Sequence, residues 1–279
     1  MNEEKIVAKI FDFFITQRCT MNCKLCAAAV PYIKNPCHTP LETAIKEMEK
    51  FFEVWDYAER IEFIGGEPLM HPQLFDIVKA ALKYREQFGK MRITTNATIV
   101  PSDELCQLIV DCGENFDFIV DDYGSELSKN LKPLTEKLDK YNIPYRVDVY
   151  HGDEQRFDGW IYFGDYKTVL HEDAKLKEIF DNCICVAPNN QFVCVYDGKA
   201  FSCIYAMCVS WINGVFPNDN SCIDLFSDKK SLLEKREIAR KFCQNPIEAC
   251  KYCNGFDSEN SKRYPGPPCQ VPKNFRGVE

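Results

Sequence analysis

The chain has 279 residues, of which 46% are apolar and 13% aromatic, so it can bury a sizeable core and disorder of the whole chain is excluded. Its net charge of −8 argues against nucleic acid as the main partner, because proteins that bind a phosphate backbone usually carry a basic surplus. No apolar stretch reaches the length of a membrane span and no secretory signal is recognisable, so we expect a soluble, cytoplasmic protein without a membrane partner.

Sixteen cysteines are the most unusual feature of this composition. Disulfides are typical of small secreted domains, whereas this chain is larger and shows no export signal. We therefore expect reduced thiols, several of which serve as metal ligands.

A first strand is predicted over residues 8–16, and a cysteine-rich loop follows it directly. Cys19, Cys23 and Cys26 have the spacing CxxxCxxC, which lets one loop bring three soft thiolates to a single iron–sulfur cluster. A cluster held in this way keeps one iron open for a small chelating molecule. A structural zinc site completed by Cys37 or His38 is the alternative, because structural zinc takes four protein ligands.

A helix and a second strand come next, and the strand ends in a pair of glycines. The helix is indicated by an apolar stripe at helical spacing, formed by Leu41, Ile45, Met48, Phe52 and Trp55. The strand over residues 61–64 leads into Gly65 and Gly66, where a backbone without side chains can approach a ligand closely. The following Glu67 could accept a charge-assisted hydrogen bond from an ammonium group.

The same alternation continues through the middle of the chain. Helical stripes are predicted within residues 74–82, 105–109 and 131–138, and strands over residues 91–95, 116–120 and 145–150. This pattern predicts a parallel sheet, because each crossover helix returns the chain in the same strand direction. Two strands end in polar residues: Asn96 follows one, and Asp121 and Asp122 follow the next, either as ligand contacts or as a solvated acidic turn.

The last strand candidate of this series is residues 160–163. Too few residues separate it from the strand that ends at residue 150 to form a crossover helix. Either the last helix of a partial barrel is missing or residues 160–163 are not its sixth strand.

After about residue 181 the alternation stops and cysteines become more frequent. Residues 192–196 and 199–203 flank Asp197 and Gly198 in the pattern of a β-hairpin, and a helix is predicted at about residues 231–241. We expect two domains, one over residues 1–180 and a smaller one over residues 181–279.

The spacing of Cys19, Cys23 and Cys26, together with the sequence GGEP at residues 65–68, resembles the signature of the radical S-adenosylmethionine (SAM) superfamily. The resemblance implies an α/β fold with a partial (β/α)6 TIM-like barrel. It also implies a [4Fe-4S] cluster whose open iron binds SAM and passes it one electron. The reduced SAM then releases a 5'-deoxyadenosyl radical, and this radical takes a hydrogen atom from the substrate. The SAM-binding residues that it implies are Leu25, Gly65, Gly66, Glu67, Pro68 and Asn96.

The C-terminal cysteines carry a second resemblance. Cys185, Cys203, Cys250 and Cys253 are spaced as in the Twitch domain, a shortened SPASM domain made of a hairpin and a helix, which holds one auxiliary [4Fe-4S] cluster. A zinc ribbon on the same four residues is the alternative. Three further cysteines compete as ligands, namely Cys183, Cys243 and Cys269, and five others are expected to be small buried hydrophobes, namely Cys106, Cys112, Cys194, Cys208 and Cys222.

The resemblances predict an oxidoreductase of the dehydrogenase type that oxidises a sugar or cyclitol alcohol and receives electrons from a flavodoxin or ferredoxin. A radical SAM enzyme that modifies peptides is the second hypothesis. A non-catalytic iron–sulfur or zinc-binding module is a third hypothesis, from another class. The sequence does not identify a catalytic acid or base.

Overall fold

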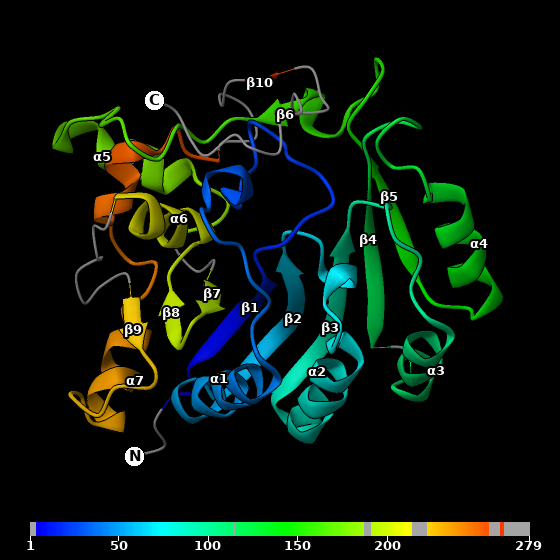
Figure 1. Cartoon of the computed structure of the whole chain (residues 1–279). Helices are drawn as coiled ribbons and strands as arrows, with labels where there is room; N and C mark the ends of the chain where they lie inside the picture. Colours follow the sequence, from blue (N-terminus) through cyan, green and yellow to red (C-terminus); the bar gives the residue numbers. More distant parts are fainter. Residues whose placement is uncertain (1–3, 114, 187–190, 214–221, 257–262, 265–279) are drawn as a thin grey trace.

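The computed structural model describes residues 4–113, 115–186, 191–213, 222–256 and 263–264. Its centre is a sheet of eight strands in the order β5-β4-β3-β2-β1-β7-β8-β9 (Figure 1). The elements of the first half are β1 (Val7–Thr16), α1 (Leu41–Val54), β2 (Tyr57–Gly65), α2 (Leu74–Ala81), β3 (Phe88–Thr95), α3 (Asp103–Asp111), β4 (Phe116–Asp122), α4 (Leu131–Lys140) and β5 (Tyr145–Val149). Strands β1 to β5 are parallel neighbours in chain order.

The second half of the chain extends the same sheet beyond β1. Its elements are β6 (Trp160–Ile161), α5 (Asp173–Asn182), β7 (Phe192–Tyr196), β8 (Lys199–Phe201), α6 (Ile204–Asn213), β9 (Cys222–Asp224), α7 (Leu232–Arg240) and β10 (Arg263–Tyr264). Strand β7 is parallel to β1, and β8 and β9 follow it as antiparallel neighbours. Short 3-10 helices occur at Val30–Tyr32, Pro68–Met70, Leu82–Gln87, Arg156–Asp158 and Glu248–Tyr252.

The α/β class and the partial barrel are confirmed, but the sixth parallel strand is not where a sixth β/α unit would place it. Residues 160–161 form β6, which pairs with β10 in a separate two-stranded antiparallel sheet. Between β5 and β6 the chain forms only the 3-10 helix Arg156–Asp158, so no crossover helix returns it to the edge of β5. The sixth parallel strand is β7, at the opposite side of the series, beside β1.

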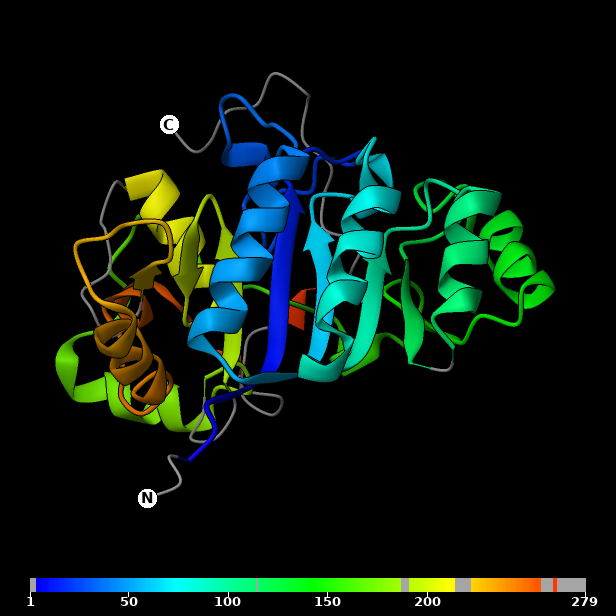
Figure 2. The ribbon, with the colours of Figure 1, turned by 90° about the horizontal axis from the view of Figure 1, so that it is seen from below.

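The helix-covered face of the sheet holds the main core. Phe11, Phe13 and Ile15 alternate along β1 and are completely buried. The ring of Phe11 stacks on Phe51 of α1 with 3.9 Å between centroids. Figure 2 shows α1 and α2 side by side on this face. Residues between these positions, such as Asp12, face the other side of the sheet.

The hairpin prediction is confirmed, since Tyr196 pairs with Lys199 and the intervening Asp197 and Gly198 have φ of 49° and 69°. Positive φ at both turn residues matches the right-handed twist of the two strands. Helices α5 and α6 were not predicted. Helix α6 is buried on almost every side from Tyr205 to Ser210, so its sequence shows no apolar stripe to detect. None of the helices in the described ranges is long and apolar enough to span a bilayer.

Candidate active site

A cavity of about 210 Å³ opens at the carboxyl ends of β1 to β4, and it brings most of the predicted site together. Its lining includes the three thiols of the first loop, the glycine pair after β2 and polar residues from the ends of β3 and β4. These residues are Cys19, Cys23, Cys26, Gly65, Gly66, Asn96 and Asp121. In parallel α/β folds the carboxyl ends of the strands are the usual position of a ligand site.

The three cysteines of the first loop are only partly exposed. The backbone amide of Met21 and the side-chain amide of Asn96 each donate to Cys19 Sγ over 3.4 Å. Burial raises the pKa of the Cys19 and Cys26 thiols. A bound iron ion would reverse this effect, because coordination to a metal removes the thiol proton. The donor set therefore fits a [4Fe-4S] cluster with one iron left open.

Neither proposed fourth zinc ligand faces these thiols. Cys37 contacts the Tyr196 hydroxyl at 3.4 Å, and His38 Nδ1 lies 2.8 Å from Thr16 Oγ1. Within the described residues, no three His, Cys, Asp or Glu side chains converge closely enough for a single metal ion. The described cysteines form no disulfide with one another.

The glycine pair lets the end of β2 pack directly against the start of the cysteine loop. The amide of Gly66 donates to the Thr16 carbonyl over 2.7 Å, and the amide of Glu67 donates to the Arg18 carbonyl over 2.8 Å. A Cβ atom on Gly65 would lie 2.2 Å from the Thr16 oxygen, and one on Gly66 would lie 2.1 Å from the Arg18 oxygen. Side chains at both positions are excluded by sterics, so the glycines fix the cysteine loop over the cavity.

Glu67 is completely buried and does not line the cavity. One carboxylate oxygen accepts from the amide of Leu69 and the hydroxyl of Thr95, and the other accepts from the amide of Asn96, over 2.8 to 3.0 Å. Burial raises the pKa of Glu67 to about 7, although these donors lower it. The direct contact with an ammonium group that the sequence suggests is therefore not supported. The carboxylate instead ties the end of β2 to the end of β3.

Two other predicted SAM-binding residues also lie outside the lining of the cavity. Pro68 is buried at the start of the 3-10 helix that follows Glu67. The backbone carbonyl of Leu25 accepts a hydrogen bond of 2.9 Å from Trp160 Nε1. Asn96 does line the cavity, and its Nδ2 bonds to both Cys19 and Thr20.

The two carboxylates at the end of β4 have different surroundings, because successive residues of a strand face opposite sides. Asp121 lines the cavity and accepts from the Tyr123 hydroxyl over 3.3 Å. Burial and, secondly, the charge of Asp148 raise the pKa of Asp121 to about 7. Asp122 accepts from the Gly124 amide over 2.8 Å and from His151 over 2.9 Å, so it stabilises the turn.

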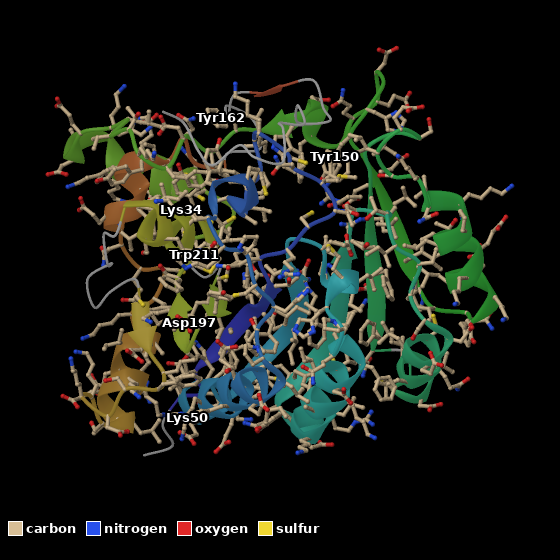
Figure 3. All side chains as sticks on the ribbon, in the orientation of Figure 1. Lys34, Lys50, Tyr150, Tyr162, Asp197 and Trp211 are labelled. Carbon is tan, nitrogen blue, oxygen red and sulfur yellow. The ribbon has the colours of Figure 1, made fainter. Side chains whose placement is uncertain are left out.

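Two aromatic residues in the cavity were missed by the sequence reasoning. Tyr123 and Trp160 line it, and their ring centroids lie 5.9 Å apart. Tyr150, labelled in Figure 3, stacks on Tyr123 at 5.4 Å and meets Trp160 edge-on at 5.2 Å. The sequence feature that could have identified Tyr123 and Tyr150 is their position directly after the ends of β4 and β5. Trp160 had no such signal, because its strand lies outside the main sheet.

A second cavity gathers the C-terminal cysteines. The four predicted auxiliary ligands Cys185, Cys203, Cys250 and Cys253 all line it, in an otherwise apolar wall. Segments far apart in the chain meet here: the residues after α5, the end of β8 and the 3-10 helix Glu248–Tyr252. Four predicted ligands on the wall of one cavity fit an auxiliary [4Fe-4S] cluster.

The same cavity distinguishes between the cysteines that compete as ligands of the auxiliary cluster. Cys183 lines it together with Cys185, so it remains a candidate ligand. Cys243 does not line it and donates to the Ser202 carbonyl over 3.6 Å. Cys269 lies outside the described residues. Of the five expected packing cysteines, Cys106, Cys112, Cys194 and Cys208 are buried and Cys222 is partly exposed.

The two cavities share part of their walls. Ala27, which follows Cys26, and Ile204, which follows Cys203, line both of them. One small and one aliphatic side chain are thus common to the walls of the two cavities.

Comparison with known proteins finds a family match for the N-terminal part of the chain. Residues 13–142 match the model of the Radical SAM superfamily. This range runs from β1 to just beyond α4 and contains the cysteine loop and the glycine pair, so a radical SAM superfamily domain occupies it. No curated protein sequence matches the chain significantly.

Solved structures share the fold at low sequence identity. BtrN in complex with AdoMet and 2-DOIA is 17% identical, with a TM-score of 0.55, and the match covers 96% of this chain and 100% of BtrN. SuiB of Streptococcus suis is 11% identical, with a TM-score of 0.53, and the match covers 95% of this chain and 78% of SuiB. A SuiB structure bound to S-adenosylmethionine matches 55% of this chain at 12% identity and a TM-score of 0.41, and this chain spans about a third of it (34%).

Proposed function

We propose that the radical SAM superfamily domain at residues 13–142 makes this protein a radical SAM enzyme. Cys19, Cys23 and Cys26 would hold a [4Fe-4S] cluster, and the cavity beside them would hold SAM near Gly65, Gly66 and Asn96. The cluster and SAM together supply a 5'-deoxyadenosyl radical that removes a hydrogen atom. The observation that carries this proposal is that the three thiols, both glycines and Asn96 line one cavity.

The roles of the chain's own residues follow from this cavity. Gly65 and Gly66 hold the cysteine loop in place, and the buried Glu67 fixes the neighbouring strand ends. Asn96 donates a hydrogen bond to Cys19 and so orients a cluster ligand. Leu25 and Pro68 lie outside the lining of the cavity. They would contribute to SAM binding indirectly, by holding the backbone of the cysteine loop and of the segment after the glycine pair.

We further propose that the net reaction is the oxidation of a sugar or cyclitol alcohol. Such an oxidation removes a hydrogen atom, a proton and an electron from one carbinol. Asp121 supports this reaction, since it is a carboxylate in the cavity with a pKa near 7 and can accept a proton. Tyr123 and Trp160 line a cavity of about 210 Å³, and this small volume favours a small substrate over a peptide. The BtrN structure contains AdoMet together with 2-DOIA.

The electron of this oxidation would pass to an auxiliary [4Fe-4S] cluster in a Twitch domain, over residues 181–279. Cys185, Cys203, Cys250 and Cys253 would be its ligands. With four thiolates such a cluster has no open iron for substrate, so electron transfer is the role that its ligand set supports. The walls shared by the two cavities at Ala27 and Ile204 support a short path.

Anaerobic reconstitution tests the proposal directly. The protein loaded with iron and sulfide is incubated with SAM and dithionite, and 5'-deoxyadenosine is measured by liquid chromatography. We expect 5'-deoxyadenosine from the wild type and none from Cys23→Ala. If the wild type forms none, or if metal analysis finds zinc and Mössbauer spectra show no iron–sulfur cluster, the protein is a non-catalytic binding module. Panels of cyclitols, sugars and peptides then separate alcohol oxidation from peptide modification.

A further inference from the structure

Two carboxylates lie next to each other on the face of the sheet that bears the cavity. Asp121 of β4 and Asp148 of β5 are partners in the register of these neighbouring parallel strands, which Figure 1 shows side by side. Adjacent strands are about 4.8 Å apart, and partners in register project from the same face of a sheet. Two like charges this close repel each other, so at most one of the two groups ionises freely.

Two arginines hold Asp148 in its ionised form. Arg146, two residues earlier on β5, donates through Nε and Nη2 to its two carboxylate oxygens over 2.8 and 3.1 Å. Arg156, in the 3-10 helix that follows β5, donates through Nη1 to Oδ2 of the same carboxylate. Burial raises the pKa of Asp148, but the hydrogen bonds from both arginines outweigh this effect and hold the pKa below its usual value. Asp148 is therefore a fixed negative charge.

Asp121 is bonded differently from its neighbour. It accepts from the Tyr123 hydroxyl over 3.3 Å, whereas the guanidinium groups of both arginines bond to Asp148. Burial is the main cause that raises the pKa of Asp121, followed by the charge of Asp148, with a smaller increase from Glu67. Tyr123 and Arg156 lower the pKa of Asp121. The two carboxylates thus differ in kind, because Asp148 stays charged and Asp121 can take up a proton.

The neighbouring strand and loop contribute further groups around this pair. On β3, Arg92 donates to both oxygens of Asp117 over 2.6 and 2.7 Å, and this contact is the main cause of its raised pKa, with Asp148 as a smaller one. After β5, Tyr150 has its pKa raised by burial and then by the charge of Asp121. Arg92 is therefore engaged by another carboxylate, and Tyr150 remains neutral.

Arg156 acts on both carboxylates of the pair. It bonds directly to Asp148, and its charge also reaches Asp121. Its side chain is 30% exposed, while that of Asp148 is 7% exposed, so the arginine covers the carboxylate from the side of the solvent. A substitution of Arg156 therefore changes the charge beside Asp121 and leaves the bidentate contact between Arg146 and Asp148 in place.

We infer that Asp148 is a positioning residue, which keeps Asp121 a proton acceptor by holding a fixed negative charge beside it, and that Arg156 limits the strength of this effect. The inference rests on the proposed function, because it concerns the proton acceptor of the alcohol oxidation. In that step the hydroxyl O–H bond of the substrate radical breaks, its electron pair stays on the substrate oxygen, and a new O–H bond forms on Asp121. No further reactant takes part in this proton transfer.

Variants that remove the two charges separately test this inference in the full-length, reconstituted protein. Protonated Asp121 is followed between pH 5.5 and 8.5 by its infrared carbonyl band, after subtraction of the spectrum of the same protein with Asp121→Asn. Product formation from the alcohol that the wild type oxidises is measured over the same pH range.

We expect the two charge changes to move the midpoint of both titrations in opposite directions. Asp148→Asn removes the like charge and leaves Arg146 and Arg156 facing Asp121, so the midpoint should fall by about one pH unit or more. Arg156→Gln removes a cation that favours ionised Asp121, so the midpoint should rise. Arg156→Lys keeps the charge and should retain the midpoint of the wild type. A merely structural role would not give shifts of opposite sign.

Asp117→Asn is the matched control, because Asp117 is a buried carboxylate bonded to an arginine on the same strand, about 13 Å before Asp121. It should keep the midpoint of the wild type. Shifts of Asp148→Asn and Arg156→Gln in the same direction, or no shift in Arg156→Gln, would overturn the role of Asp148 even where product is formed. If Asp148→Asn does not fold, the comparison of Arg156→Gln with Arg156→Lys decides. Opposite infrared shifts without product from any alcohol would overturn the proposed oxidation and leave the effect of Asp148 on Asp121 standing.

Discussion

At Gly66 the backbone is packed so closely that any side chain would disturb the wall of the cavity. Its position between the Arg18 carbonyl and the Cys19 side chain leaves no room for a methyl group. In Gly66→Ala we expect the cysteine loop to shift, because the Cβ contact of 2.1 Å is with backbone and not with a flexible side chain. Iron bound per chain, and the change that SAM causes in the electron paramagnetic resonance spectrum of the reduced protein, should both be strongly reduced.

Gly113→Ala is the matched control for this substitution. Gly113 has φ of +79°, but among the described residues, apart from its chain neighbours, no atom lies within 4 Å of the position that its Cβ would take. Alanine there therefore introduces backbone strain of about 1 kcal/mol without a collision. This variant should bind iron like the wild type. Equal iron content in Gly66→Ala and Gly113→Ala would contradict the steric role of Gly66.

Asp121 gives the reaction a predicted dependence on pH. A carboxylate accepts a proton only when it is ionised, so product formation should rise as the pH increases through about 7, the pKa of Asp121. In Asp121→Asn we expect this rise to disappear and the rate of product formation to fall about 100-fold or more, a typical loss for a general base. The measurement is product formed per minute between pH 5.5 and 8.5.

Asp122→Asn is the control, since Asp122 faces the turn and bonds to Gly124 and His151. It should keep the pH profile of the wild type. Formation of 5'-deoxyadenosine without substrate should also persist in Asp121→Asn, which separates proton transfer from SAM cleavage. Normal product formation by Asp121→Asn would show that another group accepts the proton.

The contact between α1 and the β7–β8 hairpin depends on one buried carboxyl group. Glu47 Oε1 accepts from the amide of Gly198 over 2.8 Å, while Oε2 has no partner within the described residues. Burial, with Asp197 as a smaller cause, raises the pKa of Glu47 to about 8. The folded protein therefore holds this proton more tightly than the unfolded chain does.

This linkage predicts how stability changes with pH. Because the folded pKa lies above the unfolded value, the stabilisation is complete below about pH 4.5 and is lost as the pH rises through about 8. Glu47→Gln mimics the protonated group, so it should unfold at a higher temperature than the wild type at pH 9, with a stability difference of about 1 to 3 kcal/mol. Thermal unfolding at pH 6 and pH 9 checks this, with the exposed Glu49→Gln as control. A variant that loses as much stability as the wild type between these pH values would contradict the assignment.

The whole molecule is organised around two groups of thiols that are close in space and distant in sequence. We expect the wild type to bind about eight iron ions per chain and Cys250→Ala or Cys253→Ala to bind about four, because each cubane contains four. Cleavage of SAM with dithionite should survive in these variants, whereas turnover of substrate should be lost. Iron analysis and product assays measure the two effects.

Cys243→Ala serves as the comparison, because Cys243 is buried near this group but does not line the cavity. It should keep about eight iron ions per chain. Normal substrate turnover by Cys250→Ala would reject the electron-transfer role of the auxiliary cluster. The same assay in Cys183→Ala determines whether Cys183 or Cys185 is the ligand that precedes β7.

Sequence patterns predicted the strands and helices of the first half because each is a local, periodic arrangement of apolar residues. They failed for α6, whose surroundings are apolar on nearly all sides, and for Trp160, whose place depends on pairing with a distant segment. The division into domains at about residue 180 stays a prediction, although β7 continues the sheet of the first half directly beside β1.

The sequence by itself determined the thiol triplet and the glycine pair, because their chemistry depends on short spacings within a single loop. Only the tertiary structure decided which face of β4 meets the cavity, that Glu67 is buried away from it, and that β7 lies beside β1. It alone also placed Ala27 and Ile204 on the walls of the same two cavities. Residues so far apart in the chain meet only when the packing of whole elements brings them together.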